Sequence, residues 1–154
     1  MTHRSPTLLL TLASLLVLGA CGEEAKDTHP DQLVTKRKAI FKQFTKALEP
    51  MGMVARGRKD YNPREFNINA LELQKLTSQP WPLFTADSNY PPTLAKPTVW
   101  EKPSDFKLAQ DKFQTTIAGL VQASQGSDLD SIKQAVDGVQ RSCKSCHDQF
   151  RNER

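Results

Sequence analysis

The sequence predicts an all-α protein, an antiparallel four-helix bundle with one long proline-rich crossover loop. Apolar residues recur at three- and four-residue intervals in four separate stretches, a period that is typical of helices with one buried face. No stretch shows the strict alternation of apolar and polar residues that marks a half-buried strand. Many of the prolines gather between the second and third stretches, so we expect a long connection there and short turns elsewhere.

The first 20 residues have the pattern of a bacterial export signal. Arg4 supplies a positive charge, and the apolar run at 8–18 is shorter than the roughly 20 residues of a membrane-spanning helix. Small residues, Gly and Ala, stand directly before Cys21, as in lipoprotein signals that are cut at a cysteine. We expect removal of residues 1–20 and a lipid anchor on Cys21, on the periplasmic side of a bacterial membrane. The alternative is an ordinary signal peptide that is cut nearby.

The mature chain is expected to begin with a short tether, residues 21–32, followed by one folded domain, residues 33–154. The tether is polar and contains a proline, whereas the domain is long enough to bury a core of its own. The first helix is predicted from about residue 32 to residue 56. Pro50, near its end, predicts a kink or an early stop.

The second helix is predicted to begin with Asn62 as its cap and Pro63 at its first position, and to continue to about Ser78. The segment 79–103 contains six prolines, too many for regular structure, and we expect it to form the crossover loop. A short turn is expected within it at 98–100.

The third helix is predicted to begin at Ser104, whose hydroxyl can cap it, and to end at Gly126 in a left-handed conformation. The fourth begins near Ser127 or Asp128 and has the most regular stripe in the chain. Its members alternate three and four residues apart, as in the seam of a packed bundle helix: Leu129, Ile132, Val136, Val139, Cys143, Cys146 and Phe150.

The charge of the chain excludes one class of partner. The formal net charge is +4, and loss of Arg4 with the signal leaves a mildly basic protein. Such a charge favours acidic protein partners or anionic surfaces. It is too small and too dispersed for nucleic-acid binding, and no nucleic-acid motif accompanies it.

The sequence Cys143-Lys-Ser-Cys146-His147 has the most specific chemical pattern. An exported Cys-x-x-Cys pair can form a disulfide or a thiol redox site, but the redox site would follow a strand, and none is predicted here. A four-ligand zinc site fails because no second Cys/His pair exists. The added histidine makes the motif the attachment signature of haem c, so we expect one covalent haem per chain.

The helical stripe places this motif in the interior of the bundle. Cys143 and Cys146 occupy seam positions, and His147, four residues beyond Cys143, shares its face and can ligate the iron. Arg151, one turn further, lies over the same face. Two interpretations of Arg151 stay open: contact with the imidazole or a haem carboxylate, or a solvated cation that suits the helix terminus.

The sixth iron position distinguishes an electron carrier from a gas-binding protein. The thioether candidates are Met51 and Met53, while His29 belongs to the tether and lysine ligation ranks lower. Phe41 and Phe44, one turn apart on the first helix, can instead cover the iron. Such an apolar face would exclude water, would stabilise O₂ poorly and would still admit NO or CO.

These residues resemble the cytochromes c′, the class II c-type cytochromes. The resemblance extends from about Leu33 to Arg151, and its most specific part is the haem motif close to the C-terminus. It also rests on five further segments: Arg37 ahead of Phe41, then residues 57–61, 76–84, 97–100 and 126–129.

The resemblance implies a four-helix bundle, often a homodimer packed through its first two helices, with a five-coordinate iron. His147 would be the iron ligand, Arg151 the basic residue beside it, and Arg37 the arginine near the haem propionates. Phe41 would occupy the distal position where low-spin relatives place a methionine. The family is mostly soluble, so the expected lipid anchor on Cys21 is a departure from it. By analogy, Gly22 after that cysteine slightly favours the outer membrane.

Our first expectation of function is a non-enzymatic haem protein that binds NO and CO and contributes to NO tolerance. The alternative is an electron carrier for a redox partner protein, with Met51 as sixth ligand. Slow NO reductase or peroxidase activity would need a distal acid–base group, and none is evident near Phe41 and Phe44.

Overall fold

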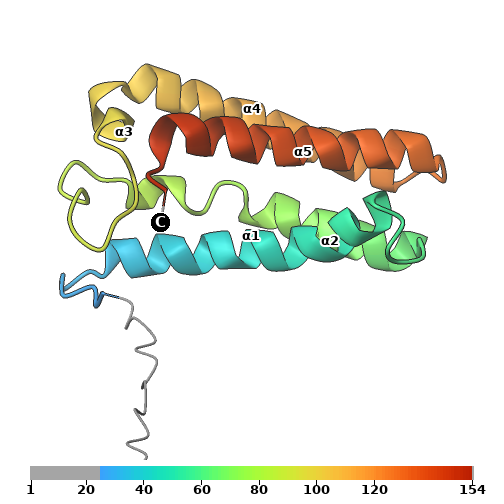
Figure 1. Ribbon diagram of the computed structural model, residues 1–154, viewed down its shortest axis with the longest axis horizontal. Helices are drawn as coiled ribbons and strands as arrows, with labels where there is room; N and C mark the ends of the chain where they lie inside the picture. The colour runs from blue at the N-terminus through green and yellow to red at the C-terminus, as the bar shows by residue number, and fades with distance from the viewer. Residues whose placement is uncertain (1–24, 154) are drawn as a thin grey trace, which may run out of the picture.

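A computed structural model describes residues 25–153, and Cys21 and the expected signal lie outside this range. The described chain is an all-α bundle, which confirms the predicted fold class (Figure 1). Its helices are α1 (Leu33–Ala55), α2 (Pro63–Leu76), η1 (Trp81–Leu83, a 3-10 turn), α3 (Thr98–Glu101), α4 (Pro103–Ser124) and α5 (Leu129–Phe150).

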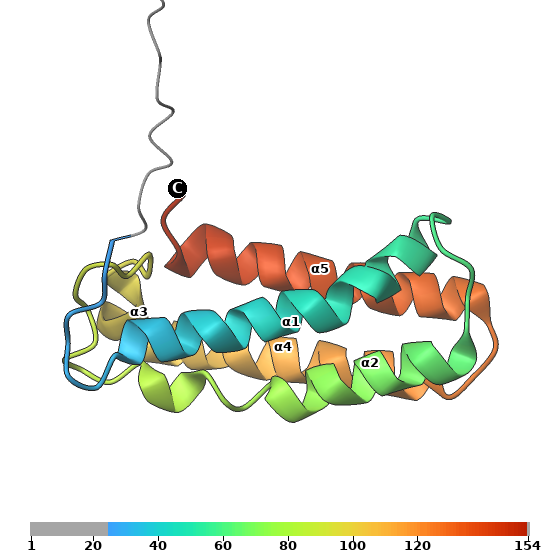
Figure 2. The same ribbon diagram turned by 90° about the horizontal axis from the view of Figure 1, so that it is seen from below.

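The four long helices pack in the cyclic order α1, α2, α4 and α5. The α1 and α5 helices touch less than the other neighbouring pairs. Figures 1 and 2 place α3, the crossover loop and the C-terminal end of α5 at one end of the bundle, beside the N-terminal end of α1. The haem motif near the end of α5 therefore lies beside the crossover loop.

The buried core follows the predicted stripes with one exception. Apolar side chains from all four long helices form a continuous cluster, and the stripe of α5 contributes Ile132, Val136 and Val139 to it. Leu129, the first stripe residue, is instead 42% exposed. It stands in the first turn of α5, where the helix has only begun to enter the bundle.

The predicted cap of α2 and the predicted start of α5 are confirmed, and two other predicted helix ends are wrong. Asn62 caps α2 by accepting from the Glu65 amide at 3.1 Å, and Asp128 caps α5 by accepting from the Asp130 amide at 3.1 Å. Ser104 is no cap, because α4 begins one residue earlier, at Pro103, whose fixed φ suits a first helical position.

The α4 helix does not end in a left-handed glycine. Its C-cap, Gln125, keeps a right-handed backbone (φ −82°, ψ −14°), and the Gly126 amide closes the turn on the Ala123 carbonyl at 3.1 Å. Gly57, after α1, adopts the left-handed conformation instead, with φ 65°. Glycine suits that position because a side chain would be strained there.

Pro50 does not stop α1, which continues for five more residues to Ala55. Figure 2 shows that the C-terminal part of α1 bends away from the line of its first turns. A proline inside a helix removes one backbone hydrogen bond and pushes its ring against the preceding turn. Of the two alternatives predicted for Pro50, a kink or an early stop, the structure shows a bend and no stop.

The crossover loop is fastened to the end of α5. Ala95 forms an antiparallel bridge with Arg151, the Lys96 amide donates to the Phe150 carbonyl at 2.9 Å, and the Asn152 amide donates to the Leu94 carbonyl at 2.8 Å. The bond to Phe150 satisfies a carbonyl group that the end of α5 would otherwise leave without a partner. Together these contacts hold the loop beside the haem motif.

The last described residues of the expected tether contact the domain. The Asp27 carboxylate accepts from the Thr35 amide at 2.9 Å, and the His29 ring stacks on Tyr90 with centroids 4.8 Å apart. The N-cap residue of α1, Gln32, makes no side-chain cap bond. Asp27 supplies the cap instead, through its bond to the Thr35 amide. Among residues 25–153, no helix is long and apolar enough to cross a membrane.

Candidate functional site

A cavity of about 470 Å³ opens between α1, α5 and the crossover loop. Its size is within the usual range of cofactor sites, about 300–1,000 Å³. It lies where α1 and α5 are least closely packed, and its lining is mostly apolar and aromatic. Every site residue predicted for the haem lines it: Arg37, Phe41, Phe44, Cys143, Cys146, His147 and Arg151.

The α5 helix supplies the reactive groups of this cavity. Cys143 and Cys146 are half-buried, lie one turn apart and form no disulfide with each other. Burial raises the pKa of both thiols, and for Cys146, with the neighbouring Cys143 adding to the effect, the pKa reaches about 11. The thiols are therefore protonated at neutral pH, unlike the reactive thiolates of thiol redox sites.

His147 lies at the same end of the cavity. Burial, and then the nearby guanidinium of Arg151, lower the pKa of its imidazole. Both effects favour the neutral ring, which is the form that can donate a nitrogen lone pair to a metal. Arg151 is exposed and follows directly after α5.

The opposite wall is aromatic. The ring of Phe41 meets Phe44 edge to face at 5.3 Å and Trp81 at 6.0 Å, and Phe44 stacks on Phe113 at 5.4 Å. Phe113 lies on α4, so its place in the cavity depends on the packing of that helix. The Trp81 indole nitrogen is buried without a hydrogen-bond partner among the described residues.

Arg37 is buried at the cavity wall and holds the crossover loop. Its guanidinium donates to the carbonyls of Leu83 and Ser88, each at 3.1 Å, and to the Thr93 hydroxyl at 2.6 Å. It also lies over the ring of Phe84, 4.5 Å from the centroid. This clamp was missed by sequence reasoning, which assigned Arg37 to a haem propionate. Three of its five N–H donors are engaged, so a propionate contact is still available to the others.

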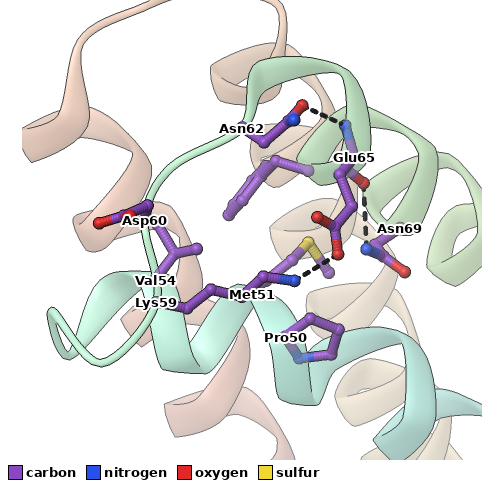
Figure 3. Close-up of a pocket in the computed structure, with 9 residues that line it drawn as sticks. Pro50, Met51, Val54, Lys59, Asp60, Asn62, Glu65 and Asn69 are labelled. Carbon is purple, nitrogen blue, oxygen red and sulfur yellow. Dashed lines mark hydrogen bonds and ion pairs between the residues drawn. The ribbon is translucent and has the colours of Figure 1, made fainter.

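The expected alternative iron ligand lies elsewhere. Met51 is only 1% exposed, belongs to the core and does not line the cavity. Figure 3 shows it beside Pro50 and Val54 at the turn that joins α1 to α2. Within residues 25–153, neither a methionine nor a second histidine lines the cavity. The packing therefore gives no support to methionine ligation by Met51.

The residues present fit a covalently attached haem. Two thiols and an imidazole stand on one helix face, an apolar wall faces them, and the space between them has the volume of a cofactor site. A bare metal ion fits less well, because no group of three His, Cys, Asp or Glu residues is gathered anywhere in residues 25–153. Fold and cavity together define a class of protein: a c-type haem protein built on a four-helix bundle, with its attachment motif near the C-terminus.

Comparison with known proteins places the chain within that class. The family model for cytochrome c′ matches residues 32–151. Cytochrome c′ of Rhodopseudomonas palustris is 32% identical over 146 residues, covering 93% of this chain and 94% of the relative. Cytochrome c′ of Alcaligenes xylosoxydans xylosoxydans is 29% identical over 125 residues, covering 81% and 97%. The chain belongs to the cytochrome c′ family and binds one c-type haem covalently.

Solved structures agree with this assignment. Cytochrome c′ of Shewanella frigidimarina has a TM-score of 0.77 at 29% identity, covering 83% of this chain and all of that one. A ferrous variant of the Alcaligenes xylosoxidans protein with bound NO has a TM-score of 0.77 at 27% identity, covering 84% and 100%.

Proposed function

We propose that this protein is a non-enzymatic haem protein that binds NO, and also CO, at a five-coordinate high-spin iron, and that it serves NO tolerance. One observation carries the proposal: the wall that faces His147 across the cavity is formed by phenylalanine and tryptophan rings and offers no methionine or histidine ligand. Relatives solved with NO and with CO bound support the choice of ligands.

Each site residue has a role in this proposal. Cys143 and Cys146 hold the haem through thioethers, and His147 ligates the iron on the proximal side. The haem supplies an iron with one open coordination position. Phe41 and Phe44 exclude water and larger ligands from that position, and they offer no hydrogen-bond donor that would stabilise bound O₂. Arg37 donates to a propionate while it clamps the loop, and Arg151 helps to keep the imidazole of His147 neutral.

An enzymatic role receives little support from the cavity. Turnover of NO or peroxide would require a distal group that moves protons. The one carboxylate in the lining is Glu49, which is exposed and stands two helical turns beyond Phe41.

The test is the optical spectrum of the haem-loaded protein in the ferric and ferrous states, with and without NO. We expect high-spin spectra that shift when NO is added. The matched variant is Met51→Leu, which should leave the spin state unchanged. A low-spin spectrum that ignores NO, and that becomes high-spin in Met51→Leu, would assign the protein to electron transfer instead.

We further propose that the protein is attached through a lipid on Cys21 to the periplasmic face of a bacterial membrane, with the outer membrane slightly favoured. Support comes from the sequence around Cys21, which lies outside the described residues. Cys21→Ser should release the protein into the soluble fraction of cells. Retention in the membrane fraction would exclude this anchor.

We also propose that the protein forms a homodimer in which α1 and α2 of the two copies pack together. Ile68 and Leu71 on α2 are 57% and 45% exposed, and large apolar side chains at such positions are available to cover one another between two copies. Sedimentation of a Cys21→Ser protein should give a dimer, and Ile68→Lys should shift it toward a monomer.

A further inference from the structure

Basic side chains gather in the lining of the haem cavity. The lining contains five of them, Arg37, Lys38, Lys42, Arg56 and Arg151, against the single carboxylate of Glu49. The formal net charge of the chain is +4, and +3 without Arg4, so the positive charge of the mature chain is concentrated around the cavity.

Three of these cations are available to a partner. Lys42, Arg56 and Arg151 are exposed, and within residues 25–153 their charged groups make no ion pair or hydrogen bond. We call these three residues the basic rim. Several other surface lysines are paired with a carboxylate, as in the pairs of Lys107 with Asp111 and of Lys144 with Asp148. Unpaired cations retain their full field toward a partner.

Part of the basic rim forms a cluster of donors. A Cβ atom placed on Gly52 would lie 3.1 Å from a guanidinium nitrogen of Arg56 and 3.1 Å from the amide nitrogen of Gln140. Donor groups from α1 and α5 thus meet over the bare backbone of Gly52, and an acidic group could accept from both.

The dimensions of the basic rim indicate an extended partner. Lys42 lies on α1 and Arg56 is the C-cap residue of this helix, fourteen residues further along, which corresponds to about 21 Å at 1.5 Å per residue. A small anion can contact only one of these positions at a time. A protein partner that buries an ordinary interface area, about 800 Å² on each side, can contact Lys42 and Arg56 at the same time.

The surroundings of the basic rim favour a protein over a lipid surface. Helices that lie on membranes combine cations with large apolar side chains that enter the lipid. The large exposed apolar residues among residues 25–153 are Met53, Ile68, Leu71, Leu108 and Leu129, and none of them lines the cavity.

We propose that the basic rim is the docking surface for a protein that presents a carboxylate-rich face. Lys42 and Arg56 attract this face, and Glu49, between them on α1, opposes binding and limits it to partners that leave that position uncharged or basic. The proposal does not depend on NO binding, because NO carries no charge that the basic rim could steer.

The test measures binding of poly-L-glutamate, as a carboxylate-rich surface, to the haem-loaded protein by titration calorimetry at low salt. The double variant K42E/R56E should weaken binding by about tenfold or more. The matched control is R64E/K112E, which reverses two exposed cations on α2 and α4 outside the cavity lining and should change binding by less than about twofold. Glu49→Gln should tighten binding.

Equal weakening by both double variants would overturn the proposal, because the net charge alone would then control binding. Unchanged binding in Glu49→Gln would remove that residue from its part in selecting partners. Vesicles that contain anionic phosphatidylglycerol test the alternative, that the basic rim binds a membrane surface. If K42E/R56E abolishes vesicle binding and leaves poly-L-glutamate binding unchanged, the basic rim is a membrane contact and the proposal fails. The NO spectrum of each variant, recorded separately, tests the proposed function.

Discussion

The clamp formed by Arg37 offers the most informative perturbation of this structure. Arg37→Met keeps a long side chain but removes the guanidinium that bonds the Leu83 carbonyl, the Ser88 carbonyl and the Thr93 hydroxyl. Arg37 is 3% exposed and Ser88 is fully buried, so water cannot readily replace these bonds. The crossover loop would lose its attachment to α1.

The expected loss follows from the number of bonds. A buried acceptor left without a donor costs about 1–3 kcal/mol, and part of this is recovered because a charge no longer has to be buried. We therefore expect the free energy of unfolding to fall by about 3 kcal/mol. For a domain of this size the melting temperature should then fall by about 10 °C.

The assay is denaturant unfolding of the haem-loaded protein, followed by circular dichroism at 222 nm. Arg37→Lys separates the two roles of the residue, because it keeps the charge for a propionate but lacks the planar fork that reaches three acceptors. We expect Arg37→Lys to lose about 2 kcal/mol. The control Arg141→Met, an exposed arginine on α5, should change stability by less than about 0.5 kcal/mol.

Two results would refute this reasoning. If Arg37→Met is as stable as the wild type, the three bonds contribute nothing net. If Arg37→Lys matches the wild type while Arg37→Met is destabilised, only the charge of residue 37 matters, and the clamp is incidental.

Two further predictions concern the cavity wall and the start of α5. Under the proposed function Phe41 covers the open coordination position, so Phe41→Ala should speed CO binding to the ferrous protein by about tenfold or more; unchanged flash-photolysis kinetics would remove Phe41 from that role. Hydrogen bonds from the Ser131 hydroxyl and the Asp130 amide lower the pKa of Asp128, so its contribution to stability is present above the usual aspartate pKa and is lost as pH falls through the lowered value. Asp128→Asn keeps a hydrogen-bond acceptor but cannot titrate. The melting temperature of this variant should therefore lie below that of the wild type at neutral pH, and the difference should shrink as the pH falls to about 2.5. A difference that stays constant over this range would contradict the account.

Features that depend on short-range interactions along the chain were predicted correctly more often than features that depend on long-range contacts. Helix existence depends on local periodicity, and caps such as Asn62 and Asp128 depend on neighbours two or three residues away. Ser104 and Gly126 were predicted as helix ends from residue type alone. Pro103 and the right-handed backbone at Gln125 decided those ends instead.

Within the site, the sequence predicted the residues whose chemistry is local to one helix. Cys143, Cys146 and His147 lie within five residues, so their common face follows from helical geometry. Arg37 differs, because its acceptors lie 46 to 56 residues away in a loop whose path no local pattern describes. Phe113 likewise joined the site only because α4 packs against α2 and α5, which brings its ring onto Phe44.

The sequence by itself determined the fold class, the haem motif and the aromatic character of the wall that faces it, because each is encoded in residue type and short-range spacing. Only the tertiary structure decided that Met51 is buried in the core away from the cavity, that Arg37 clamps the crossover loop, and that unpaired cations line the cavity. These outcomes depend on which helices become neighbours. That choice is made by burying side chains from distant segments together, and no single segment contains the information.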